Sequence, residues 1–315
     1  MTLYLLRQLA ASAVVLLLVV TITFFMIQMA PGRLSVLTDP NMAPEVRANI
    51  ERRFGLDQPA HIQYVRWIGN LVQGDMGTSL VFNRPALSMI IERLPATLTL
   101  GLASLLLTVV IGIPAGVIAA RWPNSPLDQF LNFLAMVGLA IPNFWLGILM
   151  IILFSVQLGW LPGAGMRTLG IEFSVLDRLS YLVLPAIVLA TSTTAELMRY
   201  TRSSWLENMN QDYVRSARAK GLSERWVHNK HILKNALIPV VTIIGLALPR
   251  IVGGSAIIES LFAWPGIGSM AVEAAVNRDT TLILGTTIFI ATAVILSNLL
   301  IDALYGFLDP RIRFD

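Results

Sequence analysis

The chain of 315 residues is 55% hydrophobic and only 13% charged, with a mean hydropathy of +0.69. So few charges cannot cover a water-soluble globule of this size, which excludes an ordinary soluble domain and predicts an all-α polytopic membrane protein. Most of the positive charge expected in the cytoplasm lies in one segment, as topology alone would produce, so the net charge of +4 does not indicate nucleic-acid binding.

The first expected membrane span covers residues 9–30, which follow Arg7 and comprise 22 residues without a charge. A helix of this length crosses a hydrocarbon core of about 30 Å at about 1.5 Å per residue. A cleavable signal peptide is the competing interpretation, but the apolar run is longer than such peptides carry and Pro31 occupies the expected cleavage point. We therefore expect a transmembrane helix.

A water-exposed insertion is expected at residues 31–95, where both charge signs and several turn residues occur. Apolar side chains at helical spacing predict amphipathic helices over 44–54, ended by Gly55, and over 64–72. A third short helix is expected over 85–94. Such an insertion would form a packed lid or present a docking surface to a partner outside the membrane, and the sequence leaves both open.

Further spans are expected at residues 98–120, 130–156, 181–198, 237–258 and 282–301. Within 130–156, Pro142-Asn143 predicts a kink that packs against neighbouring helices, with an amide side chain able to face a cavity. Within 237–258, Arg250 is costly in lipid, so it should face protein or water unless it snorkels or pairs with another subunit. Asn143 and Arg250 are therefore the candidate residues of a solute pathway.

Residues 199–236, called the basic segment below, hold eight Lys or Arg residues against three acidic ones. This excess places the segment on the cytoplasmic side. Gly221 supplies a position where a left-handed turn costs little, Ser223 can cap a following helix, and Pro239 stands where that helix meets the next apolar run. Two short helices at the membrane surface are therefore expected, with a stop between them.

The distribution of Lys and Arg supports six spans with both termini in the cytoplasm. Twelve of these residues then lie on cytoplasmic segments and three on the two short outer loops. Seven more lie on the long insertion, which largely escapes the positive-inside rule because of its length. The chain is thus expected to divide into residues 1–30, the insertion 31–95 and a five-helix core, 96–315.

Signatures of catalysis, nucleotide binding and metal binding are missing from the sequence. It has no cysteine, no P-loop pattern G-x-x-x-x-G-K-[ST], no G-x-S-x-G and no H-E-x-x-H. His228 and His231 stand at a spacing that metals can use, but Lys230 and Lys234 beside them would repel a cation. We therefore expect no catalytic residue, no cofactor and no metal site in this chain, and energy supplied by another subunit.

Several short motifs follow one another in an order that resembles a known family. Residues 215–221 (RSARAKG), followed by 231–236 (HILKNA) and Ile238-Pro239, resemble the coupling motif of permease subunits of ATP-binding-cassette importers. Arg215 replaces the family's Glu and Lys234 its motif Pro, departures similar to the branch for dipeptides, oligopeptides and nickel. Further matches lie at residues 55–59, 63–64, 74–79, 94–98, 141–145, 159–162, 259–268 and 309–313.

The resemblance implies a type I importer permease fold with six transmembrane helices, multi-pass in the bacterial inner membrane. Its partners would be a second homologous permease subunit, two cytoplasmic ATPases holding ATP and Mg²⁺, an extracytoplasmic solute-binding protein and membrane lipid. The helix before Gly221 would sit in a groove of an ATPase and act as a lever. The implied coupling residues are Asp212, Tyr213, Arg215, Ser216, Ala217, Arg218, Ala219, Lys220 and Gly221.

The solute is left open by the sequence. Di- or oligopeptides are the leading hypothesis, because they are the broadest use of the branch. Residues 262–266 and 277–279 are also similar to nickel importers, and glutathione or glycosides are further alternatives. An ATP-independent secondary transporter is a separate class; it would need buried ionisable groups, for which only Arg250 qualifies. The basic segment could also serve only topology and anionic lipid binding.

Overall fold

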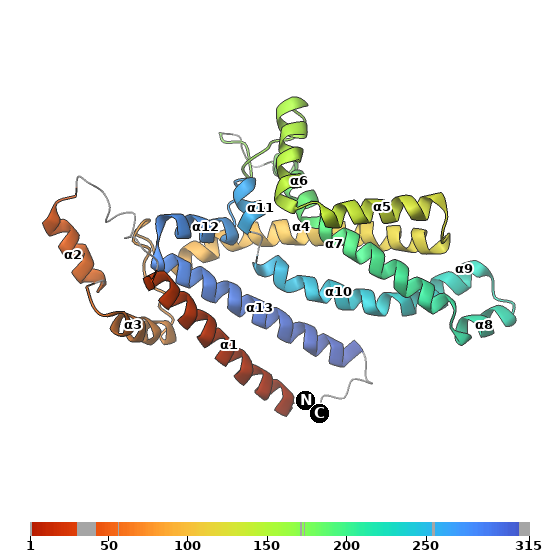
Figure 1. Ribbon diagram of the computed structural model, residues 1–315, viewed down its shortest axis with the longest axis horizontal. Coiled ribbons are helices and arrows are strands. Elements are labelled where there is room, and N and C mark those ends of the chain that lie inside the picture. The colour runs from red at the N-terminus through yellow and green to blue at the C-terminus, as the bar shows by residue number, and fades with distance from the viewer. Residues whose placement is uncertain are drawn as a thin grey trace. The chain divides into compact units, whose positions relative to one another are not determined.

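The computed structural model describes residues 2–29, 42–55, 57–170, 172, 174–253 and 256–308, and within these ranges the backbone forms helices and no strand. The expected all-α class is confirmed. Figure 1 shows the elements in chain order: α1 (Thr2–Met29), α2 (Pro44–Phe54), α3 (Ala60–Val72), α4 (Ala86–Arg121), α5 (Pro126–Ala140), α6 (Asn143–Met150), the π-helical turn η2 (Ile151–Gln157), α7 (Val175–Met209), α8 (Asp212–Ala219), α9 (Glu224–Trp226), the π-helical turn η3 (Val227–Ile232), α10 (Leu233–Gly253), α11 (Ala256–Leu261), α12 (Ile267–Asn277) and α13 (Thr280–Leu308).

Several described helices are long and apolar enough to cross a membrane. They are Arg7–Met29 of α1, all of α4 and α7, and Thr280–Leu299 of α13. Helices α5 and α6 with η2 are together long and apolar enough as well, and their bend suits either a broken span or a re-entrant loop. Helix α10 occupies most of the stretch expected as a further span, and some of its side chains, including that of Arg250, lie outside the described part. The polytopic character is confirmed, whereas the count of six spans stays a prediction.

Helix α4 is continuous, although the sequence predicted a short helix that stops near Pro95 and a separate span after it. That prediction was wrong because packing on both sides of Pro95 outweighs the roughly 3 kcal/mol that a proline costs inside a helix. Before it, Ile90 lies in one buried cluster with Ile267 and Met270. After it, the hydroxyl of Thr97 is buried and accepts a hydrogen bond from the Ile267 N–H at 2.8 Å.

Only part of the basic segment forms separate surface helices. Helix α7 continues to Met209, and its last turns stay helical because Trp205 is buried in a cluster with residues of α8 and η3. Helix α8 is the first expected surface helix. The second was predicted to end near Pro239, which was wrong: α9 passes through η3 into α10, and Ala236 and Val240 are buried on either side of the proline.

A sharp break separates α5 from α6, where the sequence predicted only a kink. Ile141 has an extended backbone, with φ −80° and ψ 123°, and its N–H closes α5 onto the Val137 carbonyl at 3.0 Å. A residue that precedes proline avoids the helical region, so α5 ends before Pro142 and α6 begins at Asn143. The two helices consequently differ in direction by 102°.

The chain forms two compact units, one of residues 1–97, 252–256 and 265–315 and the other of residues 98–251 and 257–264. In the first unit, the rings of Tyr64 and Trp67 of α3 pack on Phe24 of α1, and the Tyr64 hydroxyl lies 2.6 Å from that of Thr21. These contacts fit the packed-lid interpretation of the insertion. Its use as a docking surface and the expected three-part division of the chain stay predictions.

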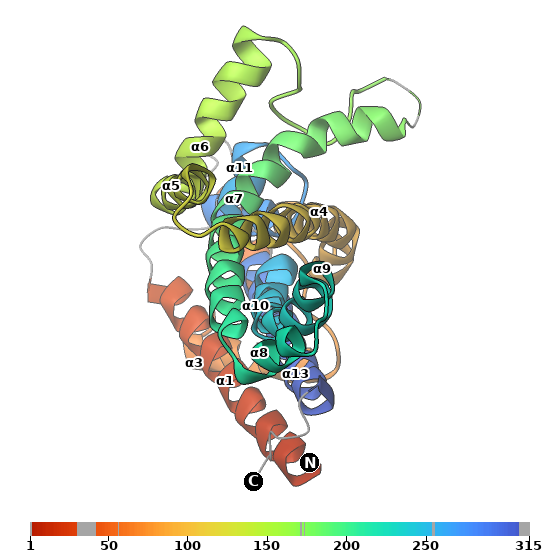
Figure 2. The same ribbon diagram turned by 90° about the vertical axis from the view of Figure 1, so that its right-hand side faces the viewer.

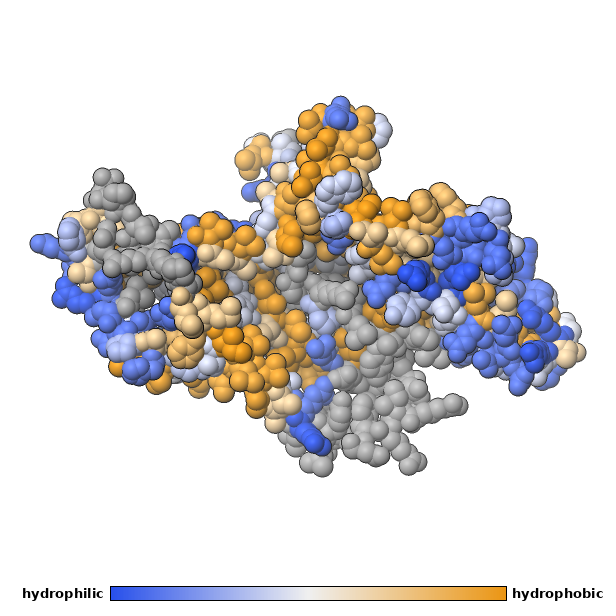
Figure 3. All heavy atoms as spheres, viewed as in Figure 1, coloured by the Kyte–Doolittle hydropathy of each residue, from blue (hydrophilic) through white to orange (hydrophobic). Residues whose placement is uncertain are grey.

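The second unit carries the basic segment and the close helix packing beneath it. Gly116 of α4 lets α7 approach so closely that a Cβ there would lie 2.6 Å from the Met198 carbonyl oxygen. Figure 2 shows α7 leading into α8 and α9. Figure 3 shows hydrophobic side chains over α5 and α6 and hydrophilic ones over α8 and α9. Within this unit, apolar helices suited to lipid therefore lead to a hydrophilic end suited to water.

Candidate functional site

Helix α8 is a short amphipathic helix that follows directly after α7. Its Val214 and Ala217 are buried, and its charged residues face solvent. The structure thus gathers the expected coupling residues on one helix and the turn that ends it, with Ala217 pointing inward. The exposed ones are Asp212, Tyr213, Arg215, Ser216, Arg218, Ala219, Lys220 and Gly221.

A buried apolar cluster, called the anchor cluster below, holds α8 on the rest of the unit. Its members are Ala120, Trp205, Val214, Ala217, Val227, Ile232 and Ala236. They come from α4, α7, α8, η3 and α10, so α8 is attached to the ends of three long helices at once. Separating α8 from the rest of the unit would expose this apolar surface to water, at a free-energy cost of about 25 cal/mol per Å². We therefore expect α8 to move together with those helix ends.

The turn after α8 is fixed by Gly221, whose φ of +76° lies in the left-handed region. Its N–H donates to the Arg218 carbonyl at 2.9 Å, and the Leu222 N–H donates to the Ala217 carbonyl at 3.4 Å. No heavy atom lies within 4 Å of the position that a Cβ would take. The backbone angle, not lack of space, therefore requires glycine, and the helix stops at the residue that the sequence indicated.

Beyond the turn, an ion pair replaces the cap that the sequence predicted. Ser223 stands before α9, but its side chain makes no capping hydrogen bond. Instead, the Arg218 guanidinium donates to both carboxylate oxygens of Glu224, at 2.9 and 3.2 Å. Arg218 thereby lowers the pKa of Glu224, which also lies 3.3 Å from the Nε2 of His228. The first turn after Gly221 is thus tied back to α8.

His228 lies against the anchor cluster. Its ring stacks on Trp205 with centroids 5.7 Å apart and planes inclined by 10°. Burial lowers the pKa of His228, because a charged imidazole would lose its hydration there. Among the described residues, no group of three or more His, Asp or Glu side chains could hold a metal ion.

The two candidate pathway residues are only partly described. Asn143 opens α6 and is half-buried, and its amide lies 3.5 Å from the Ser192 hydroxyl of α7, at the outer limit for a hydrogen bond. Arg250 belongs to α10 by its backbone, but its side chain lies outside the described residues. Their assignment to a pathway stays a prediction.

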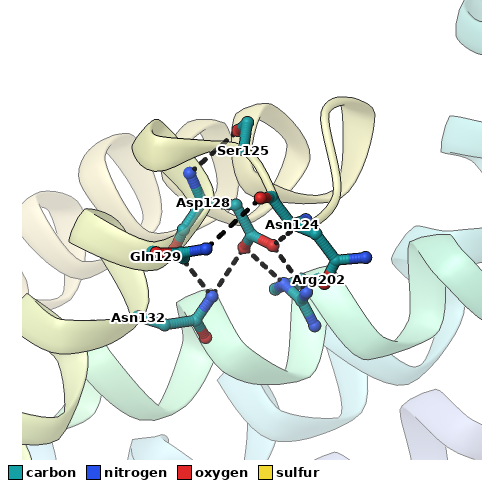
Figure 4. Close-up of polar contacts among 6 residues, drawn as sticks. All are labelled: Asn124, Ser125, Asp128, Gln129, Asn132 and Arg202. Carbon is teal, nitrogen blue, oxygen red and sulfur yellow. Dashed lines mark hydrogen bonds and ion pairs between the residues drawn. The ribbon is translucent and has the colours of Figure 1, made fainter.

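Sequence reasoning missed a buried ion pair between α5 and α7. Asp128 of α5 is buried, and the Arg202 guanidinium of α7 donates to both of its carboxylate oxygens (Figure 4). One local signal was available: Ser125 stands three residues before Asp128 at the start of an apolar run, which is a capping pattern. The Asp128 N–H does donate to the Ser125 hydroxyl, at 3.2 Å. No local pattern points to Arg202.

Long apolar helices, with an exposed basic helix anchored on their ends, are the architecture of a membrane-embedded protein with a hydrophilic end. Residues 112–314 match the family described as binding-protein-dependent transport system inner membrane component. Residues 1–101 match the N-terminal part of such components. The chain belongs to this family, which supplies the permeases of ABC importers in the bacterial inner membrane.

Relatives match over nearly their whole lengths. The chain is 44% identical to the oligopeptide transport system permease protein AppB of Bacillus subtilis, covering 100% of both chains. It is 42% identical to a putative peptide permease protein of Brucella suis, covering 98% of both. It is 38% identical to the glutathione transport system permease protein GsiC of Salmonella paratyphi A, covering 99% of both.

A solved structure shares the fold. The MetNI methionine ABC transporter, in inward-facing conformations, contains a chain that matches with a TM-score of 0.53 and 19% identity, covering 71% of this chain and 97% of that one. A second crystal form gives a TM-score of 0.54 at 20% identity, covering 70% and 96%. At such identity the likeness shows the fold alone.

Proposed function

We propose that this chain is one of two homologous permease subunits that form the solute pathway of an ATP-driven importer, and that its solutes are di- or oligopeptides. The observation that carries this function is α8, an exposed basic helix whose inner face is buried against the ends of α4, α7 and α10. The peptide assignment is supported by relatives that bear the names of oligopeptide and peptide permeases.

Both termini and the basic segment lie in the cytoplasm, an orientation supported by the excess of Lys and Arg on the segments concerned. Two ATPase subunits that hold ATP and Mg²⁺ bind there. On the other side, the insertion of residues 31–95 receives a solute-binding protein, and the core of residues 96–315 pairs with the second permease subunit within the lipid. Hydrolysis takes place in the ATPases, since this chain carries no nucleotide-binding pattern of its own.

Closure of the ATPases on nucleotide displaces α8. Because Val214 and Ala217 are buried in the anchor cluster, the displacement moves the ends of the long helices instead of bending α8 away from them. The exposed Arg215 and Arg218 suit a carboxylate-bearing groove, where charge complementarity fixes the register of docking. Rocking of the spans then opens the pathway, near Asn143 and Arg250, to alternate sides.

Glutathione is the second candidate solute, favoured by the 38% identity to a glutathione permease over nearly the whole chain. It is itself a short peptide with free carboxylates, so one pathway chemistry could serve both. Uptake into vesicles that contain the full complex and its binding protein separates the solutes. Saturable uptake of a labelled dipeptide or oligopeptide supports the leading assignment. Uptake of glutathione or Ni²⁺ alone would replace it.

The coupling role of α8 is tested with Gly221→Pro, because proline fixes φ near −65° where the structure requires +76°. We expect the complex to assemble but to lose transport and to uncouple ATP hydrolysis from it. Gly170→Pro is the matched control: Gly170 is also exposed, has φ +83° and would place no Cβ within 4 Å of another atom, yet lies far from α8 in the sequence. Normal transport by a well-expressed Gly221→Pro complex would contradict the coupling role.

A further inference from the structure

Asp128 and Arg202 form a buried ion pair between α5 and α7. The Arg202 Nε lies 2.7 Å from Oδ1 of Asp128 and its Nη2 lies 2.7 Å from Oδ2, which is the two-pronged geometry that guanidinium and carboxylate favour. The Asp128 side chain is only 3% exposed and that of Arg202 is 25% exposed. Figure 4 shows the pair where the turn after α4 passes into α5.

The remaining hydrogen-bonding capacity of Asp128 is also used. The Asn124 N–H donates to its Oδ2 at 2.9 Å, and the Asn132 amide donates to its Oδ1 at 2.6 Å. The same Asn132 amide donates to the Asp128 backbone carbonyl at 2.8 Å. Four donors therefore converge on one carboxylate and hold it in a single orientation. A surface carboxylate that only aids solubility needs no such surroundings.

Stability alone is a poor reason to keep this pair. Removing two charges from water costs several kcal/mol per ion, so a buried pair is often no more stabilising than apolar residues of the same size. A fully bonded pair does, however, fix which surfaces of two helices face each other. The pair therefore specifies a register between α5 and α7.

Small residues fix α5 to α7 a second time, further along. A Cβ on Gly138 of α5 would lie 3.3 Å from the Thr191 side chain and 3.5 Å from the Ala195 Cβ, both on α7. Ala135 and Ala195 are buried together with Met198. Helix α5 is thus held near both of its ends, by charge near its start and by close contact near its end.

The pair also lies on a continuous path between α8 and the break that separates α5 from α6. Arg202 precedes Trp205 by three residues, and Trp205 is buried in the anchor cluster that carries α8. Past its other attachment, α5 reaches the break at Pro142, where α6 turns away by 102°. A displacement of α8 that moves the end of α7 therefore reaches α5 through Arg202 and Asp128.

We propose that Asp128 and Arg202 are positioning residues that clamp α5 to α7, an inference that rests on the coupling role proposed above for α8. The clamp makes α5 move together with α7. The displacement of α8 therefore reaches α6 instead of causing α5 and α7 to slide past each other. Neither residue touches the solute in this role. Loss of the clamp is expected to lower the solute moved per ATP hydrolysed, not the hydrolysis itself.

The first experiment removes the charge of Asp128 in the assembled importer. Asp128→Asn is measured in vesicles with partner subunits and binding protein, for uptake and ATP hydrolysis together. We expect the ratio of uptake to hydrolysis to fall roughly tenfold. Glu172→Gln is the control, because Glu172 is exposed and lies outside both the insertion and the basic segment, so the ratio should stay unchanged. An unchanged ratio in Asp128→Asn overturns the clamp.

The second experiment replaces the clamp by a covalent bond. The chain contains no cysteine, so Gly138→Cys with Ala195→Cys introduces the only two thiols, and their Cβ separation of 3.5 Å suits a disulfide. In the otherwise unchanged chain, the oxidised form should keep transporting, because α5 and α7 need not separate. Transport that stops on oxidation and returns on reduction would show that the helices must slide, which overturns the clamp.

The decisive combination is the disulfide in the Asp128→Asn background. Oxidation should restore the ratio of uptake to hydrolysis, and reduction should lower it again, since only the mechanical link changes. If the oxidised wild-type background transports but the oxidised Asp128→Asn protein stays uncoupled, the charge serves another purpose and the clamp is refuted. Should α8 itself not couple, Gly221→Pro would transport normally whatever these variants do, so the two failures are told apart.

Discussion

Two arginine–carboxylate pairs in the same unit have the same forked geometry and opposite surroundings. Arg218 and Glu224 stand six residues apart, and their side chains are 39% and 58% exposed. Arg202 and Asp128 stand 74 residues apart, and Asp128 is almost fully buried. The first pair closes a turn that the local sequence already specifies. The second joins two helices that are far apart in the sequence, and it adds to the close contact that Gly138 of α5 makes with α7.

The difference lies in solvent. Around the exposed pair, water screens the attraction and can replace either partner, so such pairs contribute about 0–1 kcal/mol. Around the buried pair, water cannot replace a lost partner. Removing one ion therefore leaves an uncompensated charge, which destabilises the fold by about 3–5 kcal/mol. Two ion pairs with similar distances thus contribute differently to stability. The following variants test this difference, from the largest expected effect to the smallest.

Arg202→Ala should have the largest effect, because it leaves the Asp128 carboxylate buried without its cation. We expect the free energy of unfolding in detergent to fall by about 3 kcal/mol, at the lower end of the range because a quarter of the Arg202 side chain is exposed. Thermal or denaturant unfolding measures this. Adding Asp128→Ala to the same chain should recover part of the loss; a double variant no more stable than the single one contradicts the explanation.

Gly116→Ala should have the next largest effect, because it disturbs the buried packing between α4 and α7 without changing any charge. The added Cβ would lie 2.6 Å from the Met198 carbonyl oxygen and 2.6 Å from the Thr201 Cβ, so α4 and α7 must move apart. We expect a loss of about 1–3 kcal/mol. Gly69→Ala in α3 is the control, as its Cβ would meet nothing within 4 Å, and it should stabilise by up to about 1 kcal/mol. Equal effects would contradict this reading of the packing.

Acidification should weaken the contacts between α9, η3 and the anchor cluster. Burial lowers the pKa of His228 below its ordinary value of 6.5, so the stability gained from the neutral ring is complete above about pH 6.5 and lost as pH falls below it. The pKa of Glu224 is lowered from 4.5 by Arg218, so its contribution is lost only below about pH 4.5.

His228→Phe tests the histidine part, because a phenyl ring keeps the stacking on Trp205 but cannot take up a proton. Melting temperatures measured between pH 7 and pH 5 should fall less steeply for this variant than for the unchanged chain. We expect the difference in the free energy of unfolding across this window to stay below about 1 kcal/mol. An identical slope in both proteins would show that His228 does not titrate in this range.

Arg218→Ala should have the smallest effect on stability, no more than about 1 kcal/mol, because both partners of its ion pair are exposed. Salt at high concentration should abolish even this difference, since it screens exposed charges. Arg215→Ala is the control within α8, as Arg215 pairs with Asp212 on the open face. A loss as large as that of Arg202→Ala would mean that exposure does not separate the two pairs.

Local signals predicted some features well. Pro44 and Gly55 bound α2 as the sequence indicated, with Gly55 in the left-handed region. Gly221 ends α8 in the same way. Both predictions hold because proline and glycine restrict or permit φ whatever surrounds them. The anchor cluster was not predicted, because its members come from five elements that are separated in the sequence.

Other predictions failed where distant residues decide. Pro95 did not interrupt α4, since Thr97 and Ile90 are held by residues of α12. Pro142 produced a sharp break where a kink was expected. A proline destabilises a helix locally, and the surrounding packing determines whether the helix continues in spite of this.

The sequence by itself determined that this chain is a helical membrane protein, which segment is basic and where α8 stops, because hydropathy, charge and φ preferences act over a few neighbouring residues. Only the tertiary structure decided that Asp128 is buried, that Arg202 meets it and that α8 stands on three helix ends. Burial and pairing depend on which distant surfaces are brought together. The contribution of a carboxylate to stability therefore depends on the groups that exclude water around it.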